Sequence, residues 1–271
     1  MLAITDKEFT QLAGYIKQNF GINLPAEKKT LVVGRLQNFL IQKDIQTFSE
    51  YYDQVIMDKT GKAASALISL ISTNHTFFLR EPAHFDYFKG SVLPYLAQVV
   101  KDKDLRIWSA GCSSGEEPYT IAMFLDDYFG VNKSLWDTKI LATDISPKVL
   151  ELAHNGIYSN DALVSLPKQW KLKYFEKIDD ETSRVASRIK AEIIFRKFNL
   201  ITPVFPFKKK FHVIFCRNVM IYFDTATKNS LVNAFYDSLA PGGYLFIGHS
   251  ESINREISRF KYIKPAVYRK E

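Results

Sequence analysis

The stretch LRIWSAGCSSGEEP, residues 105–118, decides the fold that this sequence predicts. Its apolar start is typical of a buried strand, and the small residues that follow are typical of a tight turn. Two acids and a proline then suit the first turn of a helix, because acids favour the positive end of the helix dipole and proline is tolerated there. Glycines in the turn let a ligand approach the backbone closely. The stretch therefore predicts a ligand site between a strand and a helix.

The acids Glu116 and Glu117 narrow the kind of ligand that this turn accepts. A pyrophosphate binds at a helix N-terminus, and two carboxylates there would repel it. The expected ligand is neutral or cationic and carries hydroxyl groups. S-adenosyl-L-methionine, a sulfonium with a ribose, fits this description, whereas NAD fits it poorly. In the alternative interpretation, the two acids only cap the helix of a tight turn.

The composition predicts a globular protein with a substantial core. The chain has 271 residues, 46% of them hydrophobic, which suits one large domain with or without a small satellite. No apolar run approaches the about 20 residues of a membrane span, and the N-terminal sequence lacks the pattern of a signal peptide. The two cysteines fit reduced thiols. We therefore expect a cytoplasmic protein that is not inserted in a membrane.

The order of the predicted elements divides the chain in two. Residues 1–75 show four stretches of helical periodicity and nothing that looks catalytic. In residues 76–271, apolar runs alternate with helical patterns, which predicts a parallel doubly wound α/β sheet. We expect a small helical domain that docks a partner or covers a cleft, followed by an α/β domain that carries the chemistry.

A second strand is predicted in KILATDIS, residues 139–146, and it ends in Asp144. Ligands of open α/β sheets bind at the carboxyl ends of the strands, where an acid at the end of the second strand accepts both ribose hydroxyls. In the competing interpretation, Asp144 or Ser146 caps a helix that begins near Pro147.

Polar residues also follow the helical part of the chain, in NHTFFLREP, residues 74–82. The Asn and Thr side chains can bond a ligand, and Arg80 can hold a carboxylate with two hydrogen bonds. Alternatively, the segment is a linker whose Phe77 and Phe78 fill the interface between the two domains.

The net charge of +7 is concentrated in one part of the chain. Residues 161–210 contain 12 Lys and Arg against 6 Asp and Glu, and they include β-rich runs such as AEIIFRKF, residues 191–198. Such a basic segment attracts an acidic partner, whether nucleic acid or acidic protein. A basic face that only contacts solvent is the alternative.

Five motifs in order resemble those of the chemotaxis receptor methyltransferase family, CheR: NHTFFLR (74–80), SAGCSSGEEPY (109–119), ATDIS (142–146), CRNVMIYFD (216–224) and GGYLFIGHSE (242–251). The resemblance covers nearly the whole chain. It implies a class I methyltransferase fold, a doubly wound α/β sheet with a small all-α N-terminal domain. The implied division is a helical domain at 1–75 and a methyltransferase domain at 76–271, with a small β-subdomain inserted at about 161–198.

The same resemblance implies an activity. Members of the family transfer a methyl group from S-adenosyl-L-methionine to glutamate side chains of methyl-accepting chemotaxis receptors, giving glutamate 5-O-methyl esters and S-adenosyl-L-homocysteine. The expected partner is the cytoplasmic region of these receptors, and the expected role is adaptation in chemotaxis. Some members hold a receptor tail peptide on the inserted subdomain and others do not, and the sequence does not say which applies.

The resemblance also implies the residues of the site. Tyr222 matches a tyrosine beside the transferred methyl group. A second arginine that positions the substrate in the family has no counterpart, since residues 92–101 contain no arginine. The implied cofactor contacts, with one or both of the adjacent acids taking part, are Asn74, Thr76, Arg80, Glu116, Glu117, Asp144, Asn199, Leu200, Arg217 and Asn218.

Two other functions remain open at this point. An RNA methyltransferase would use the basic segment on phosphates, although no Asn/Asp-Pro-Pro-aromatic motif follows the fourth strand, so nucleobase methylation is disfavoured and no nucleic-acid partner is expected. A silent receptor-docking module would keep the fold and lose the cofactor. The five histidines show no metal-ligand spacing, so no metal is expected. The sequence does not predict an oligomeric state.

Overall fold

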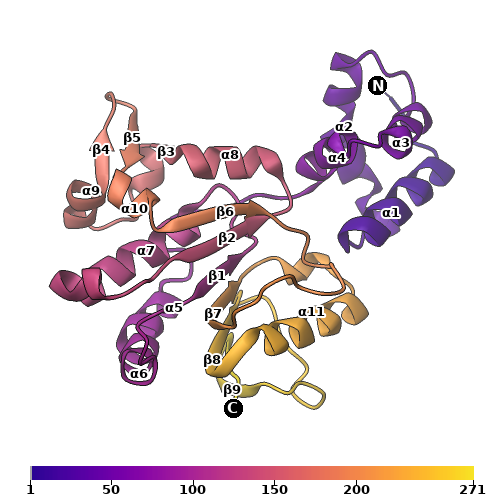
Figure 1. The fold of residues 1–271 in the computed structure, drawn as a ribbon. Helices are drawn as coiled ribbons and strands as arrows, with labels where there is room; N and C mark the ends of the chain where they lie inside the picture. Colours follow the sequence, from indigo (N-terminus) through magenta and orange to yellow (C-terminus); the bar gives the residue numbers. More distant parts are fainter. Residues whose placement is uncertain (1) are drawn as a thin grey trace.

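The computed structural model describes residues 2–271, which form a helical N-terminal part and a larger α/β part (Figure 1). The first helix, α1, is started by Thr5, whose side chain and Glu8 form a capping box, and it ends at Gly21 with φ 74°. The helices of this part pack around their own apolar core. Their bounds are Asp6–Phe20 (α1), Lys29–Gln42 (α2), Phe48–Met57 (α3) and Lys62–Ile71 (α4), with a 3-10 turn at Ala26–Lys28.

The α/β part is built on a seven-stranded sheet with the strand order β6-β2-β1-β7-β8-β10-β9. The first five of these strands are parallel, whereas β10 runs antiparallel to β8 and to β9. Their bounds are Ile107–Ala110 (β1), Ile140–Asp144 (β2), Ile193–Lys197 (β6), Phe211–Cys216 (β7), Leu239–Ile247 (β8), Lys261–Lys264 (β9) and Val267–Arg269 (β10). This is the expected class I methyltransferase architecture, a mainly parallel sheet preceded by a small all-α domain.

Helices cover both faces of this sheet, as the alternation of strands and helices predicted (Figure 1). Successive residues of β1 point to opposite faces, so Ile107 and Trp108 lie in two separate apolar cores. One core includes α5, α6 and α7, and the other includes α11. The helices are Pro82–Tyr87 (α5), Leu93–Val99 (α6), Glu116–Phe129 (α7), Pro147–Asn155 (α8) and Thr225–Ser238 (α11).

A second, three-stranded antiparallel sheet has the order β3-β5-β4 and projects beside α8 (Figure 1). Its strands are Ile157–Ser159, Thr182–Val185 and Phe175–Lys177, and the short helices Lys168–Tyr174 (α9) and Ser187–Lys190 (α10) flank them. The sequence correctly predicted an inserted β-subdomain.

The expected limits of that subdomain, 161–198, were wrong at both ends. Its first strand, β3, precedes residue 161, and the β-rich run at 191–198 contains β6, which pairs in parallel with β2 at the edge of the main sheet. An apolar run predicts a strand but not its partner, because pairing depends on where the chain returns in space. The division of the chain into 1–75 and 76–271 stays a prediction.

Among residues 2–271, no helix combines the length and the apolar character needed to cross a bilayer.

Candidate functional site

A pocket lies at the carboxyl ends of the parallel strands, as expected for an open α/β sheet. Its empty volume is about 1010 Å³, including space open to solvent, which suits a cofactor-sized molecule. The N-terminal part closes one side of it through Phe20 and Ile22. Ile22 forms an antiparallel bridge with Phe223, and the Asn23 N–H donates to the Tyr222 carbonyl at 2.8 Å. The helical part therefore contributes directly to the pocket.

The turn after β1 forms one wall of this pocket. Gly111 and Gly115 have φ angles of 94° and 100°, which L side chains rarely adopt. A Cβ atom on Gly111 would lie 2.4 Å from Cγ2 of Val219, and one on Gly115 would lie 2.9 Å from Cβ of Ala153. Both glycines are thus required by close packing of protein on protein, in addition to the ligand approach that the sequence suggested.

Asp144 lies at the end of β2 and faces the pocket while remaining 9% exposed. One of its carboxylate oxygens accepts the Ser113 N–H and the other accepts the Ser146 N–H, each at 2.9 Å. Burial raises the pKa of this carboxyl, and the backbone N–H groups oppose the shift. Asp144 therefore supports the turn and the start of α8, and its remaining lone pairs are available to hydroxyl groups.

The adjacent acids Glu116 and Glu117 have different environments, which the sequence alone did not distinguish. Glu117 lines the pocket and accepts a hydrogen bond from Ser109 Oγ at 2.7 Å. Glu116 does not belong to the described residues that line the pocket. Its carboxylate accepts Ser114 Oγ at 2.8 Å, and burial raises its pKa. Of the two, Glu117 is the acid that lines the pocket.

Arg217 lies between two acids at the floor of the pocket. Its Nη1 is 2.9 Å from Glu117 Oε2 and its Nη2 is 3.1 Å from Glu81 Oε2, while its side chain is 2% exposed. Its Nη2 also donates to the Arg80 carbonyl, and its guanidinium lies over the Phe85 ring. Arg217 therefore offsets the negative charge of the wall that Glu117 forms.

Glu251 holds the segment between β7 and Tyr222 in place. Its buried carboxylate accepts three backbone N–H groups, from Asn218 at 3.0 Å, Ile221 at 3.2 Å and Gly248 at 2.5 Å. Asn218 has φ 60°, a conformation that costs free energy unless its surroundings hold it. The sequence analysis assigned no role to Glu251. The sequence feature that could have identified Glu251 is its place at the end of the motif GGYLFIGHSE, residues 242–251.

The remaining residues predicted for the site also lie on the pocket. Arg80 lines it and donates from Nη1 to the His75 carbonyl at 2.7 Å. Asn199 donates from Nδ2 to the Asn19 carbonyl at 2.7 Å, which ties it to the N-terminal part. The predicted residues that line the pocket are Asn74, Thr76, Arg80, Glu117, Asp144, Asn199, Leu200, Arg217, Asn218 and Tyr222.

Phe77 and Phe78 do not both fill the interface between the two domains, which was the alternative interpretation of residues 74–82. Phe78 is fully buried in the core of the α/β part, where its ring contacts those of Tyr158 and Phe175. Phe77 is 43% exposed and lines the pocket. The segment is therefore a pocket wall that is anchored by one aromatic residue.

The donor set of the pocket fits the cofactor expected from the sequence. Two carboxylates, of Glu117 and Asp144, suit a cation that carries hydroxyls, and apolar residues such as Leu200 and Phe198 provide a surface for an aromatic base. Arg80 adds a cationic side chain that matches a carboxylate. S-adenosyl-L-methionine contains each of these groups.

Comparison with known proteins supports the same cofactor. Residues 74–269 match the SAM binding domain of CheR methyltransferase, and residues 7–72 match the CheR all-alpha domain. The chain is 46% identical to the chemotaxis protein methyltransferase of Borreliella burgdorferi, over 98% of this chain and 95% of the relative. It is 35% identical to that of Escherichia coli, over 98% and 92% of the two chains, and 33% identical to chemotaxis protein methyltransferase 2 of Vibrio cholerae, over 97% and 95%.

Both family models and the full-length relatives agree with the fold and with the chemistry of the pocket. The methyl donor is S-adenosyl-L-methionine. This chain belongs to the CheR methyltransferase family, the S-adenosyl-L-methionine-dependent methyltransferases of chemotaxis.

Proposed function

We propose that this chain methylates glutamate side chains in the cytoplasmic region of methyl-accepting chemotaxis receptors, giving glutamate 5-O-methyl esters and S-adenosyl-L-homocysteine. The observation that carries the proposal is the pocket of a CheR family member, which is lined by the carboxylates of Glu117 and Asp144, by Tyr222 and by residues of the N-terminal part. The expected location of this activity is the cytoplasm.

We assign the cofactor contacts from the geometry of the pocket together with the motifs. Asp144 accepts the two ribose hydroxyls through lone pairs that its backbone bonds leave free. Glu117, rather than Glu116, provides the carboxylate for the cationic part of the cofactor, and Arg80 binds its carboxylate. The further proposed contacts are Asn74, Thr76, Asn199, Leu200, Arg217 and Asn218.

The bound cofactor supplies a methyl group on a sulfonium, and the receptor supplies the nucleophile. A glutamate side chain with a pKa of about 4.3 is almost fully ionised at pH 7, so the protein needs no general base. A carboxylate oxygen forms the new bond to the methyl carbon as the bond from that carbon to sulfur breaks. The protein's contribution is to align the carboxylate and to exclude water, and alignment alone lowers a barrier by several kcal/mol.

Tyr222 is the residue that we propose for this alignment. It lines the pocket, its carbonyl is held by Asn23, and the turn that carries it is held by Glu251. Tyr222→Phe should leave cofactor affinity nearly unchanged and lower the rate of methyl transfer. An unaltered rate would remove the hydroxyl from the mechanism.

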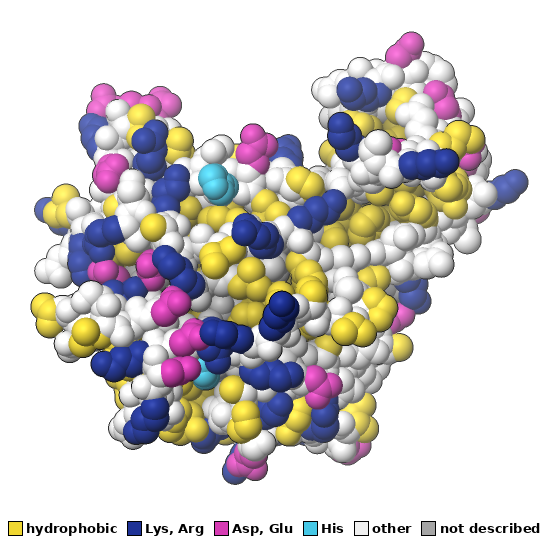
Figure 2. Space-filling model, viewed as in Figure 1, with side chains coloured by type: hydrophobic (Ala, Val, Ile, Leu, Met, Phe, Trp, Pro, Cys, Tyr) yellow, Lys and Arg dark blue, Asp and Glu magenta, His cyan; other side chains and the backbone are white. Residues whose placement is uncertain are grey.

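The basic side chains of residues 161–210 differ in how much of their charge is available to an acidic partner. Lys173 and Arg188 both pair with Asp126, and Lys209 shares Asp104 with Arg106, so the protein's own carboxylates offset part of the charge of these cations. A groove between α4 and α8, by contrast, is lined by one lysine of this segment, Lys197, together with Lys62 and Lys148, against a single acid among residues 2–271, Glu151. Figure 2 shows this face of the molecule hollowed between the small sheet and the N-terminal part.

Both parts of the protein form this groove, so a receptor helix bound there would contact the N-terminal part and the α/β part together. We therefore place the electrostatic attraction for the receptor there rather than on the whole segment 161–210. Charges on exposed side chains raise the encounter rate more than the final affinity.

The deciding experiment uses adenosylmethionine labelled on the methyl group together with receptor-enriched membranes. Alkali releases methanol from a glutamate methyl ester, whereas N-methyl groups are stable, so base-labile label on the receptor supports the proposal. Base-stable label on protein, or label on added RNA, would contradict it. A folded chain that neither binds adenosylhomocysteine by calorimetry nor transfers methyl groups would instead favour a silent docking module.

A further inference from the structure

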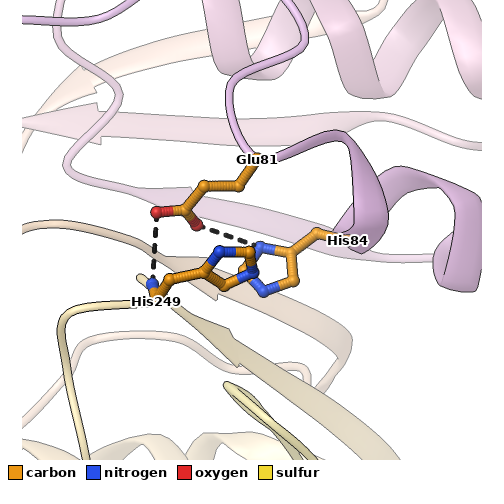
Figure 3. Close-up of side chains that lie close together, drawn as sticks. All are labelled: Glu81, His84 and His249. Atoms are coloured by element: carbon orange, nitrogen blue, oxygen red, sulfur yellow. Dashed lines mark hydrogen bonds and ion pairs between the residues drawn. The ribbon is translucent and has the colours of Figure 1, made fainter.

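Three side chains that can bind metals meet beside the pocket, although the sequence shows no metal-ligand spacing. Glu81 and His84 come from the start of α5, and His249 follows β8 (Figure 3). One ligand atom from each lies within 4.8 Å of the others. Figure 3 shows the Glu81 carboxylate above both imidazole rings, and the ring centroids of His84 and His249 are 4.5 Å apart.

His84 is a buried imidazole that packs against the ring of Phe246. It is 1% exposed, and within residues 2–271 neither of its ring nitrogens makes a hydrogen bond. Burying an imidazole without a hydrogen bond costs free energy, and such groups in folded proteins commonly bind water or an ion. Its Nδ1 lies 3.3 Å from Glu81 Oε2.

We propose that Glu81, His84 and His249 bind one divalent transition-metal cation of the zinc type, which links the end of β8 to the start of α5. Two imidazoles and one carboxylate are a ligand set that zinc uses, with water in a fourth position. The cation ties two segments that flank the cofactor pocket, because Glu81 follows Arg80 directly and also pairs with Arg217.

Two features of the cluster decide whether a cation can enter. Ligand atoms of a tetrahedral zinc lie about 3.3 Å apart, so the cluster must contract, and His249 is the exposed member of the three. Arg217 is a nearby positive charge, yet it retains Glu117 as a second carboxylate partner when Glu81 turns to the metal. The Glu81 carboxylate also has more lone pairs than its present bonds use.

The test uses the full chain after removal of metals with a chelator. Zn²⁺ is titrated by calorimetry and Co²⁺ by visible absorption, because cobalt bound by nitrogen and oxygen ligands in four-coordinate geometry absorbs strongly. We expect one site per chain, with binding that is weakened at least 100-fold by His249→Ala. The matched control is His154→Ala, which removes another exposed histidine and should change nothing.

His249 is the residue to change because it is exposed, so its variant should fold, whereas variants of buried His84 are prone to unfold. Adenosylhomocysteine affinity provides the check that the His249→Ala protein is intact. A chain without a stoichiometric Zn²⁺ site would overturn the proposal. Binding that survives His249→Ala, or that is lost equally in His154→Ala, would overturn it as well.

Discussion

Arg217 Nη1 lies 2.9 Å from Glu117 Oε2, and this pair joins the end of β7 to the first turn of α7 beneath the pocket. The side chains are 2% and 13% exposed, so water screens their attraction only weakly. Arg217 also lies 3.1 Å from Glu81. One guanidinium thus joins the pocket wall to the segment that carries Arg80.

Replacing Arg217 should therefore destabilise the protein. Arg217→Met leaves two largely buried carboxylates, of Glu81 and Glu117, without this partner, and breaking a fully buried pair in this way costs up to about 3–5 kcal/mol. Urea unfolding monitored by circular dichroism gives the free energy. The double variant Arg217→Met/Glu117→Gln should recover part of the loss because it removes one unpaired charge, and strictly additive effects would show that the pair is not coupled.

The two adjacent acids give the sharpest test of the pocket wall. Glu117→Gln should weaken adenosylmethionine by about 1–2 kcal/mol, since a charge-assisted contact to a cation is lost. Glu116→Gln is the matched control, because Glu116 keeps its bond to Ser114 outside the pocket and should leave affinity unchanged. Calorimetry on both variants measures the difference. Equal losses would place both acids at the cofactor.

Stability should fall with acid through His212. Its Nδ1 accepts the Arg106 N–H at 3.0 Å, and burial, followed by the charge of Arg106, lowers its pKa to about 4. Between about pH 6.5 and 4 the unfolded chain binds more protons at this site, so the free energy of unfolding decreases as the pH falls. His212→Asn, which keeps an acceptor for Arg106, should reduce that decrease, and His154→Asn should not. Urea unfolding at pH 7 and pH 5 provides the comparison.

Local patterns predicted the organising strand, turn and helix well, because they depend on neighbours in sequence. The run at residues 105–118 became β1, a glycine turn and α7, and α7 begins at Glu116. Ten of the eleven residues assigned to the site line one pocket. These residues were assigned from the resemblance to the CheR family, and several of them follow strand ends, where a parallel sheet gathers side chains.

The sequence did not predict features that depend on contacts between distant parts of the chain. Which of Glu116 and Glu117 faces the pocket depends on the rotation of α7 about its axis, which is set by packing. β6 was assigned to the insert because its pairing with β2 is decided by the path of the whole segment between them. The meeting of His84 with His249 has the same origin, since α5 and the end of β8 are adjacent only in the folded protein.

Glu251 is buried and holds the turn that carries Tyr222, although it makes no hydrogen bond to Tyr222 itself. Its carboxylate accepts the N–H groups of Asn218, Ile221 and Gly248. Glu251→Gln replaces one acceptor oxygen by an NH₂ group that faces these donors. At least one buried N–H then loses its partner, which should cost about 1–3 kcal/mol of unfolding free energy.

The same change should lower kcat while leaving the KM for adenosylmethionine nearly constant, since a displaced turn misaligns Tyr222 and misplacement by about 1 Å can cost on the order of 100-fold in rate. Glu256→Gln is the control, because Glu256 is exposed on the following loop. A variant with normal stability and lower kcat would still support positioning through the turn. Normal kcat in a folded Glu251→Gln protein would show that the turn keeps its shape without this carboxylate.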